Sequence, residues 1–424
     1  MIEKQIKNLI IGAGISGLTL AYYLRDDYLI LEKENEVGGY CRTIKDPNYV
    51  WDYAGHFYHF KTKEFKELFL SLVEPEEIIE QDKNTSIYYK DRLIDFPFQM
   101  NIHQLNKDEF GECLYDLYTK TGKETYDNFL DMLYGKFGAG IVDKFLKPYN
   151  EKLYAVDLKK LDKDSMGRFF PYADFGAIIR NIKENKNKSY NDKFLYLRQG
   201  AQYFINKLFA QIDKSKVQFN SEVTQINSKE KYIITNIGEK IYYQNLINTA
   251  PLNTFLKRLD KNNINLINEM SYNKVLVLNL GFDTPSKRYS KEHWIYFPSK
   301  DLNFYRIGFY NNILGAEKLS VYVEIGFSKD QPINIERQLK TTLEGMKKVG
   351  MIDDTMKLVS YSSVIMDPAY VHITSKTDDK LAHLIQDLQN ENIYTLGRYG
   401  RWTYCSMEDC MIWSKELSST KLKL

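Results

Sequence analysis

The sequence is short of three features that would each place it in a particular class of protein. It has only 4 cysteines in 424 residues, and they show no CxxC spacing. Sparse cysteine is typical of a reducing cytoplasm, so we expect a cytoplasmic protein, and the cysteines give no metal or disulfide signal. Charge of one sign is also lacking, because 58 basic and 56 acidic residues leave a formal net charge of +2. This balance argues against a broadly basic nucleic-acid-binding protein.

Long apolar runs are the third absence. No stretch reaches the roughly 18 apolar residues of a transmembrane helix, and no basic leader precedes an apolar segment and a cleavage site. We therefore expect no transmembrane segment and no secretion signal. The remaining composition, 43% hydrophobic and 27% charged, is that of a globular protein. A chain of 424 residues is long enough to form the hydrophobic cores of two or three domains. The excess is in tyrosine, with 33 residues; codon bias explains it more simply than an aromatic, hydrated cleft does.

The N-terminal segment 7–33 has the order strand, glycine turn, helix, strand, with the turn Gly12-Ala13-Gly14-Ile15-Ser16-Gly17. In a GxGxxG turn the first glycine permits the tight turn, the second lets the backbone approach a pyrophosphate, and the third lets helix and strand pack closely. The helix N-terminus attracts the phosphates, and an acidic residue after the second strand binds ribose hydroxyls. The pattern predicts a dinucleotide site. Its residues are Gly12, Gly14, Ile15, Ser16, Gly17, Glu32 and Lys33.

A second glycine pair, Gly38-Gly39, follows the acidic residue and leads to Arg42. This arrangement resembles the extended motif of FAD enzymes of the amine oxidase and glutathione reductase type, in which a second loop and an arginine hold the flavin half of a longer dinucleotide. An ordinary turn is the alternative explanation of the glycine pair. The resemblance favours FAD over NAD and adds Gly39, Tyr40 and Arg42 to the cofactor contacts.

The FAD-binding domain of such proteins is discontinuous, so we predict an α/β fold with a Rossmann-type domain made of several chain segments. Short apolar runs in 217–251 predict its middle strands, with Val223 at the adenine, and the strand 393–398 followed by a helix from about Glu408 predicts its last part. Helical spacing over 63–73 and 108–137 predicts an inserted helical domain, and alternation within 271–330 predicts a sheet. The expected boundaries are 1–60, 201–270 and 390–424 for the FAD domain, 61–150 for the helical insertion, and 151–200 with 271–389 for a substrate domain with an antiparallel sheet.

Four further segments together resemble UDP-galactopyranose mutase and its relatives within the wider amine oxidase and protoporphyrinogen oxidase group. They are Ala54-Gly55-His56-Phe57-Tyr58-His59-Phe60, the hairpin and aromatic-proline-aromatic turn in 88–101, Pro148 to Ala155 with Arg168 beyond it, and Gly397 to Met407. The resemblance covers nearly the whole chain.

The resemblance implies a mutase that interconverts the pyranose and furanose forms of UDP-galactose or a related nucleotide sugar, for surface polysaccharide biosynthesis. In that chemistry N5 of reduced FAD attacks the anomeric carbon, a flavin–sugar adduct forms, and the diphosphate returns after the ring has reclosed. NAD(P)H could act as an external reductant. A homodimer is compatible with the sequence.

The resemblance also assigns roles to individual residues. Arg306 and Arg168 would hold the diphosphate, since the guanidinium fork matches phosphate oxygens. Either His56 or His59 would face N5 of the flavin, beside Gly55. The remaining expected contacts are Tyr190, Tyr370 and Tyr404 at the phosphates, Tyr149 and Tyr154 at the nucleobase, and Gly397, Arg398 and Met407 at the FAD. For each arginine and tyrosine a purely structural role is the alternative.

Two departures from the family pattern leave the substrate open. Tyr154 stands where the family usually has tryptophan, and Cys405 stands where a further tyrosine is expected. Other nucleotides and other sugars are therefore alternatives to UDP-galactose. An FAD-dependent oxidase or desaturase of the amine oxidase or protoporphyrinogen oxidase type is the alternative activity, and a flavin-binding scaffold without catalysis is a third.

Overall fold

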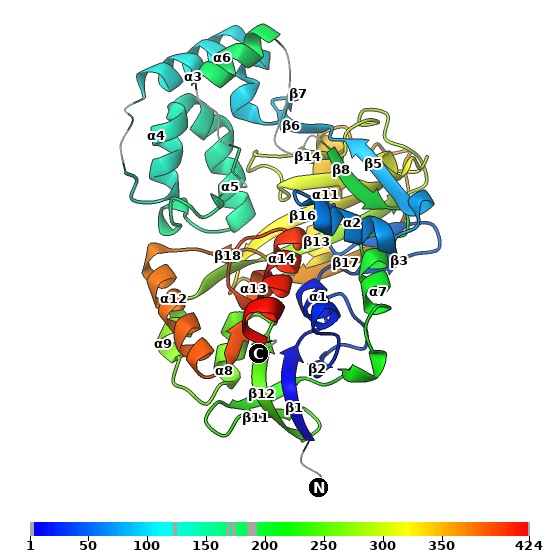
Figure 1. Cartoon of the computed structure of the whole chain (residues 1–424). Coiled ribbons are helices and arrows are strands. Elements are labelled where there is room, and N and C mark those ends of the chain that lie inside the picture. Colours follow the sequence, from blue (N-terminus) through cyan, green and yellow to red (C-terminus); the bar gives the residue numbers. More distant parts are fainter. Residues whose placement is uncertain are drawn as a thin grey trace.

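The first sheet of the computed structural model is assembled from segments that lie far apart in the chain (Figure 1). The structure describes residues 4–120, 122, 125–167, 170–171, 175–184 and 193–422. At the centre of this seven-stranded sheet, β1 pairs in parallel with β2 on one side and β12 on the other. The strands are β1 (Lys4–Ile11), β2 (Tyr28–Leu31), β9 (Val217–Gln218), β10 (Val223–Asn227), β11 (Tyr232–Thr235), β12 (Lys240–Asn248) and β19 (Ile393–Thr395). The predicted discontinuous Rossmann-type domain is thereby confirmed.

Helices cover this sheet because its strands are apolar on both faces, as expected of parallel strands. Burial of Ile10, Ile30 and Ile247 against α1 (Ile15–Leu24), α7 (Gln202–Phe209) and α14 (Met407–Leu417) forms one core. The hydroxyl of Ser414 donates to the Ser16 carbonyl at 3.0 Å, which joins the C-terminal helix to the first turn of α1. The end of the chain is thus packed directly on the glycine turn.

The second sheet has eight strands and is mainly antiparallel, as predicted. One face carries α11 (Ile335–Lys348), and the other packs towards Trp51 at the edge of the first domain. Its strands are β6 (Thr85–Tyr89), β7 (Arg92–Asp95), β13 (Ser271–Phe282), β14 (Trp294–Tyr296), β15 (Arg306–Phe309), β16 (Ser320–Ser328), β17 (Leu358–Met366) and β18 (Val371–His372).

A helical insertion lies apart from the Rossmann sheet and has its own core (Figure 1). It contains α3 (Lys107–Thr119), α4 (Phe129–Ile141), α5 (Lys147–Tyr154) and α6 (Phe175–Glu184). The single helical pattern over 108–137 is therefore two helices. The segment 61–150 is also less helical than expected, because β6 and β7 fall within it and join the second sheet through β14.

Smaller elements connect these three bodies. The connecting strands are β3 (Thr43–Lys45), β4 (Val50–Asp52), β5 (Ile78–Asp82) and β8 (Lys193–Leu197). The remaining helices are α2 (Lys63–Leu72), α8 (Leu252–Arg258), α9 (Ile264–Glu269), α10 (Tyr310–Leu314), α12 (Ser375–Asn390) and α13 (Gly397–Gly400). Of these, α8, α9 and α12 pack on the second face of the Rossmann sheet. Within the described ranges, no helix combines the length and the apolar character that crossing a membrane requires.

Candidate active site

Most of the predicted site residues converge on one cavity of about 890 Å³, which lies between the Rossmann domain, the second sheet and the helical insertion. All three bodies contribute to its wall. The predicted residues that line it are Gly12, Gly14, Ile15, Ser16, Glu32, Lys33, Gly39, Tyr40, Arg42, Gly55, His56, His59, Tyr149, Val223, Arg306, Tyr370, Arg398, Tyr404 and Met407. The cavity thus joins the proposed cofactor contacts to the proposed substrate contacts.

The two glycine segments form a cradle at one end of this cavity. Gly12 has a φ of +101°, which allows the tight turn, and a Cβ added to Gly17 would lie 2.1 Å from the Gly12 carbonyl oxygen. In contrast, a Cβ on Gly14 would meet nothing described within 4 Å. The backbone bridge between Gly14 and Gly38 brings the two segments side by side. Open space over Gly14 at the start of α1 fits the pyrophosphate of a dinucleotide.

Glu32 shapes this cradle as well as facing it. Its carboxylate accepts hydrogen bonds from the backbone N–H of Ala13 at 2.7 Å and of Glu34 at 3.0 Å. The side chain is buried, so these contacts fix its orientation. Two carboxylate oxygens have about four acceptor positions, so two remain for the ribose hydroxyls predicted from the sequence.

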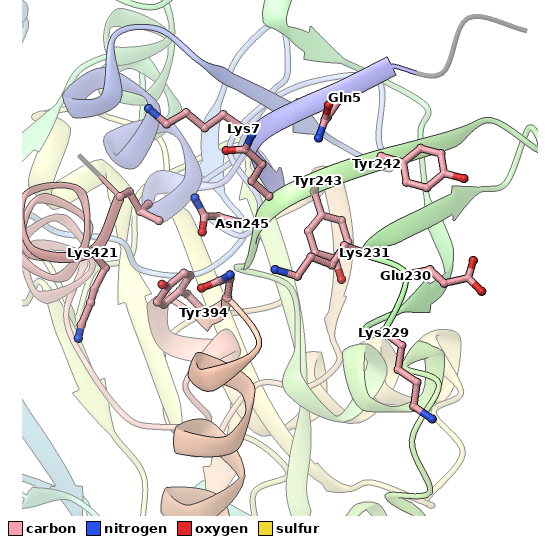
Figure 2. Close-up of a pocket in the computed structure, with 13 residues that line it drawn as sticks. Gln5, Lys7, Lys229, Glu230, Lys231, Tyr242, Tyr243, Asn245, Tyr394 and Lys421 are labelled. Carbon is pink, nitrogen blue, oxygen red and sulfur yellow. The ribbon is translucent and has the colours of Figure 1, made fainter. Parts of the chain in front are cut away.

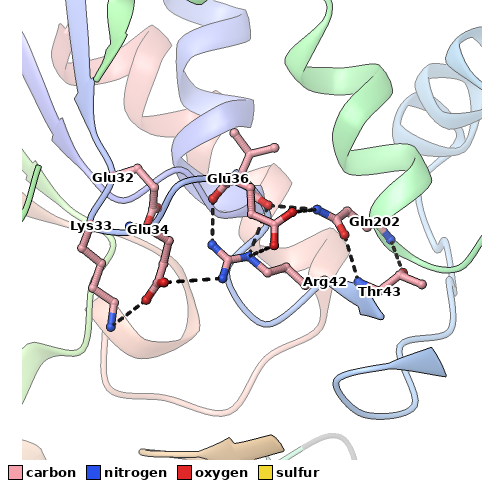
Figure 3. A network of polar contacts seen from close by, with 8 residues as sticks. Glu32, Lys33, Glu34, Glu36, Arg42, Thr43 and Gln202 are labelled. Atoms are coloured by element: carbon pink, nitrogen blue, oxygen red, sulfur yellow. Dashed lines mark hydrogen bonds and ion pairs between the residues drawn. The ribbon is translucent and has the colours of Figure 1, made fainter. Parts of the chain in front are cut away.

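Arg42 holds the second glycine loop through the network drawn in Figure 3. Its guanidinium donates to the Glu36 carbonyl at 2.7 Å and lies within 4.0 Å of the Glu34 carboxylate. Gln202 of α7 extends the network to Glu36 and to the backbone of Thr43. A large part of the bonding capacity of Arg42 is therefore used to order the loop itself, although the side chain also lines the cavity.

The two histidines occupy different parts of the cavity wall. Nδ1 of His56 lies 3.0 Å from the Ala54 carbonyl, and Arg398, Glu324 and Arg306 are the charged groups nearest its ring. Burial lowers the pKa of His56 to about 4, so the ring is neutral near pH 7, with a proton on Nδ1 and an acceptor at Nε2. His59 instead bonds the Lys193 carbonyl and lies near Lys83. His56 is the histidine beside the arginines.

Arg306 is paired with a carboxylate that the sequence did not indicate. Glu324 lies directly opposite it in the β15–β16 ladder. Nε of Arg306 donates to Glu324 Oε2 at 2.8 Å and Nη2 donates to Oε1 at 2.5 Å. Since Glu324 is buried, this bidentate pair fixes the guanidinium and leaves the Nη1 edge for another anion.

Aromatic rings surround the second arginine of the cavity, Arg398. Its guanidinium lies 4.4 Å from the ring centre of Tyr404 and 5.1 Å from that of Tyr370, and these two rings stack at 5.7 Å. Tyr149 packs on the other side against Tyr296, a residue that the sequence analysis missed. The aromatic wall so formed consists of Tyr149, Tyr296, Tyr305, Tyr370 and Tyr404, all of which line the cavity.

One hydroxyl of the aromatic wall lacks a partner. Tyr305 is 1% exposed, and its Oη has no hydrogen-bond partner among the residues that the structure describes. An unsatisfied buried hydroxyl costs about 1–3 kcal/mol. This oxygen is itself buried, so its missing hydrogen bond is a cost to the fold beside the cavity and does not mark a ligand contact.

Some predicted contacts lie elsewhere. Tyr154 does not line the cavity but packs in the insertion core, where its ring meets Tyr370 at 6.0 Å. Gly17 acts through close packing with Gly12, and a Cβ on Gly397 would lie 2.3 Å from Ser16 Oγ. Arg168, Tyr190 and most of the 183–193 loop lie outside the described residues, so their roles stay predictions.

A second cavity, of about 620 Å³, lies between β1, β12 and the C-terminal end of the chain (Figure 2). Four lysines line it, namely Lys7, Lys229, Lys231 and Lys421. Figure 2 shows Lys7, Lys229 and Lys421 pointing in different directions. Because these charges do not converge, this cavity does not offer a localised anion site.

Comparisons with known proteins agree with this geometry. Residues 10–72 match the family model of an NAD(P)-binding Rossmann-like domain. A crystal structure of reduced UDP-galactopyranose mutase superimposes with a TM-score of 0.90 and 25% identity, over 97% of this chain and 92% of that one. A putative protoporphyrinogen oxidase from Exiguobacterium sp. 255-15 superimposes with a TM-score of 0.77 and 14% identity, over 100% of this chain and 99% of that one.

Sequence comparison adds a curated relative of the oxidase type. Coproporphyrinogen III oxidase of Staphylococcus aureus (strain NCTC 8325 / PS 47) is 24% identical over 286 residues, which are 58% of this chain and 61% of the relative. The chain thus matches about three fifths of that protein's length. The resemblance to the UDP-galactopyranose mutase fold is confirmed, and the chain has the fold of a flavoenzyme with a dinucleotide-binding domain.

Proposed function

We propose that this protein is an FAD-dependent mutase that interconverts the pyranose and furanose forms of a nucleotide sugar. The observation that carries the proposal is the shared cavity, in which the glycine cradle and the Arg306–Arg398 aromatic wall face one ligand space. Reduced FAD, when bound, supplies the nucleophile for this chemistry. The chain's own residues then bind the diphosphate, orient the sugar and limit the access of water.

The cofactor would be held by the cradle and its neighbours. Backbone N–H groups at the start of α1 face the open space over Gly14, and the carboxylate of Glu32 lies beside it. Arg42 keeps the second glycine loop in place. Val223 lines the same cavity, in agreement with its expected place at the adenine.

The diphosphate would be held by Arg306, whose Nη1 edge is directed by Glu324, and by the hydroxyls of the aromatic wall. A buried guanidinium with fixed orientation binds phosphate oxygens at little entropic cost. Tyr370 and Tyr404, which line the cavity beside Arg398, are the expected contacts of this kind. His56, neutral and fixed by Ala54, would offer Nε2 as a hydrogen-bond acceptor to the sugar or the cofactor.

An FAD-dependent oxidase acting on a porphyrinogen-like substrate is the second candidate. The match to coproporphyrinogen III oxidase supports it. A porphyrinogen carries carboxylates, so Arg306 and Arg398 could bind it too. The two candidates differ in the flavin, because the mutase works with the reduced cofactor and no net redox change, whereas the oxidase consumes the oxidised cofactor.

The decisive experiment treats the purified FAD-loaded chain with dithionite, adds UDP-galactose and other nucleotide sugars, and separates the ring forms by chromatography. We expect exchange of ring form under reducing conditions only. Oxidation of coproporphyrinogen by the oxidised enzyme, with no exchange on any nucleotide sugar, would overturn the mutase in favour of the oxidase.

The role of Arg306 is tested by Arg306→Ala. Loss of charge-assisted hydrogen bonds at about 1.5–3 kcal/mol predicts nucleotide-sugar affinity roughly 10- to 100-fold weaker. Glu324→Gln should weaken binding less, since it keeps the charge of Arg306 but loosens its orientation. Arg337→Ala, on the exposed surface of α11, is the matched control. Unchanged affinity in Arg306→Ala, measured by calorimetry with UDP-galactose, would remove this residue from the diphosphate site.

A further inference from the structure

Two cysteines that look unrelated in the sequence meet at the start of α14. The Sγ atoms of Cys405 and Cys410 lie 3.6 Å apart, and the two residues are 7% and 5% exposed. Ser406 caps the helix and forms a capping box with Asp409. Cys405 therefore precedes the cap residue, and Cys410 is the fourth residue of the helix. Side chains at these two positions commonly pack against each other at a helix N-terminus.

This dithiol lies where the core of the Rossmann domain meets the wall of the large cavity. Both cysteines line it, together with Ser16 of the glycine turn and Arg398 of the aromatic wall. The pair therefore has the ligand cavity on one side and the apolar core on the other. Of the other two cysteines, Cys41 also lines the cavity, with its thiol 3.7 Å from the thioether of Met407, and Cys113 is buried in the insertion core.

The surroundings favour a thiolate on one member of the pair. The hydrogen bond from Cys405 lowers the pKa of Cys410. The Ser16 side chain lowers this pKa too, as do the backbone and the charge of Arg398, whereas burial raises it. The same bond and burial raise the pKa of Cys405. Cys410 is thus the nucleophile and Cys405 the resolving thiol, an arrangement typical of redox-active pairs.

We propose that Cys405 and Cys410 form a reversible disulfide at the wall of the ligand cavity, with hydrogen peroxide as the oxidant. The Cys410 thiolate attacks one peroxide oxygen, the O–O bond breaks, and the leaving hydroxide takes a proton to become water. The resulting sulfenic acid is attacked by Cys405, which forms the S–S bond and releases a second water. Two thiols and one peroxide give one disulfide and two waters, and an external dithiol restores the pair.

The disulfide would act on the substrate half of the cavity. The sulfur atoms must approach from 3.6 Å to about 2 Å. Tyr404 is the chain neighbour of Cys405 and stacks on Tyr370 over Arg398, so movement of Cys405 is transmitted to the aromatic wall. The thiol chemistry itself holds whichever reaction the enzyme catalyses, whereas this effect on substrate rests on the proposed mutase function.

The test uses the FAD-loaded full chain, treated with hydrogen peroxide, alkylated after denaturation and digested with trypsin. Cleavage after Arg401 and Lys415 releases one peptide, 402–415, that contains both cysteines. We expect this peptide to resist alkylation and to be lighter than the dithiol form by two hydrogen atoms, and dithiothreitol should reverse both changes. Cys410→Ser should abolish the product, Cys405→Ser should stop at the sulfenic acid, which dimedone traps, and Cys113→Ser should behave as the unchanged protein.

Three results would overturn the proposal. They are full alkylation of peptide 402–415 after peroxide treatment, a disulfide that joins Cys41 to Cys410, and a product that persists in Cys410→Ser. Each of these mass readouts is independent of turnover, so a failed mutase assay leaves this conclusion in place. A disulfide without any change in UDP-galactose affinity would refute only the link to the aromatic wall.

Discussion

Asp52 is a fully buried carboxylate that accepts three hydrogen bonds, and it has no cation partner among the described residues. Its Oδ1 accepts from Thr43 Oγ1 at 2.6 Å and from the Ala201 N–H at 2.9 Å, while Tyr196 donates to Oδ2 at 2.8 Å. These bonds join β4 to the segment that leads into α7. Complete burial nevertheless raises the pKa of Asp52 to about 7.

This shift predicts a specific pH dependence of stability. Below the reference pKa of 3.8 the Asp52 carboxyl group is protonated in both the folded and the unfolded protein. Between pH 4 and 7 it is ionised in the unfolded chain but still largely protonated in the folded protein. Asp52 therefore lowers the free energy of unfolding as the pH rises through this window, by up to about 4 kcal/mol at 1.4 kcal/mol per pKa unit. Asp52→Asn cannot ionise, so its stability relative to the unchanged protein should rise from pH 4.5 to 7.5 in urea titrations. A difference that stays constant over this range would contradict the prediction.

At the same scale, the sequence revealed residues whose role depends on local spacing and missed those that depend on strand register. The glycine turn and Glu32 follow from a contiguous motif, and Gly12, Gly14 and Glu32 line the cavity. Glu324 was missed because only the pairing of β15 with β16 sets it opposite Arg306. Tyr296 and Tyr305 were missed because the sequence contains 33 tyrosines, and only the folded sheet shows which of them face the cavity.

At the scale of elements, the junction of β1 and α1 is set by the absence of a side chain at Gly17. Gly17→Ala would place a methyl group 2.1 Å from the Gly12 carbonyl oxygen, which is backbone and cannot turn aside. We expect the helix to shift, FAD to be lost on gel filtration, and the unfolding temperature to fall. Gly111→Ala is the matched control, because that exposed position in α3 has open space and alanine favours helices by up to about 1 kcal/mol. Retention of FAD by Gly17→Ala would show that the close contact is not required.

Helix boundaries could be predicted where the apolar periodicity and the helix-capping residues indicated the same position. The helix expected from about Glu408 begins at Met407 behind a capping box. The pattern over 108–137 merged two helices, because α3 and α4 both contain helical apolar spacing and the boundary is marked only by the polar connection and the N-cap Asn128. The Cys405–Cys410 contact was missed because a spacing of five residues is informative only once the helix start is known.

At the scale of the whole molecule, the order of segments in the Rossmann sheet was predictable because motifs mark its first and last parts. The attachment of the helical insertion was not predictable, because it depends on contacts between residues far apart in the chain, among them a lysine that crosses between the bodies. Nζ of Lys152 in α5 donates to the carbonyls of Phe297 and Ser299, each at 2.8 Å, and of Phe304. These acceptors lie in the connection between β14 and β15, so one amine joins the insertion to the ends of two interior strands of the second sheet.

Lys152→Met keeps the length of the side chain and removes this connection. Burial already lowers the pKa of Lys152 to about 7. The amine therefore stays in place only because three backbone carbonyls accept hydrogen bonds from it. Each acceptor left unsatisfied costs about 1–3 kcal/mol. We expect amide hydrogen exchange, followed by mass spectrometry, to accelerate at least tenfold in α5 and residues 294–306, while β1 and β12 keep their protection. Lys159→Met, at an exposed lysine of the same insertion, should leave exchange unchanged. Equal acceleration in the Rossmann sheet would mean that Lys152 stabilises the whole fold and not this junction. The aromatic wall spans the junction through Tyr149 and Tyr296, and in that case it would not loosen selectively.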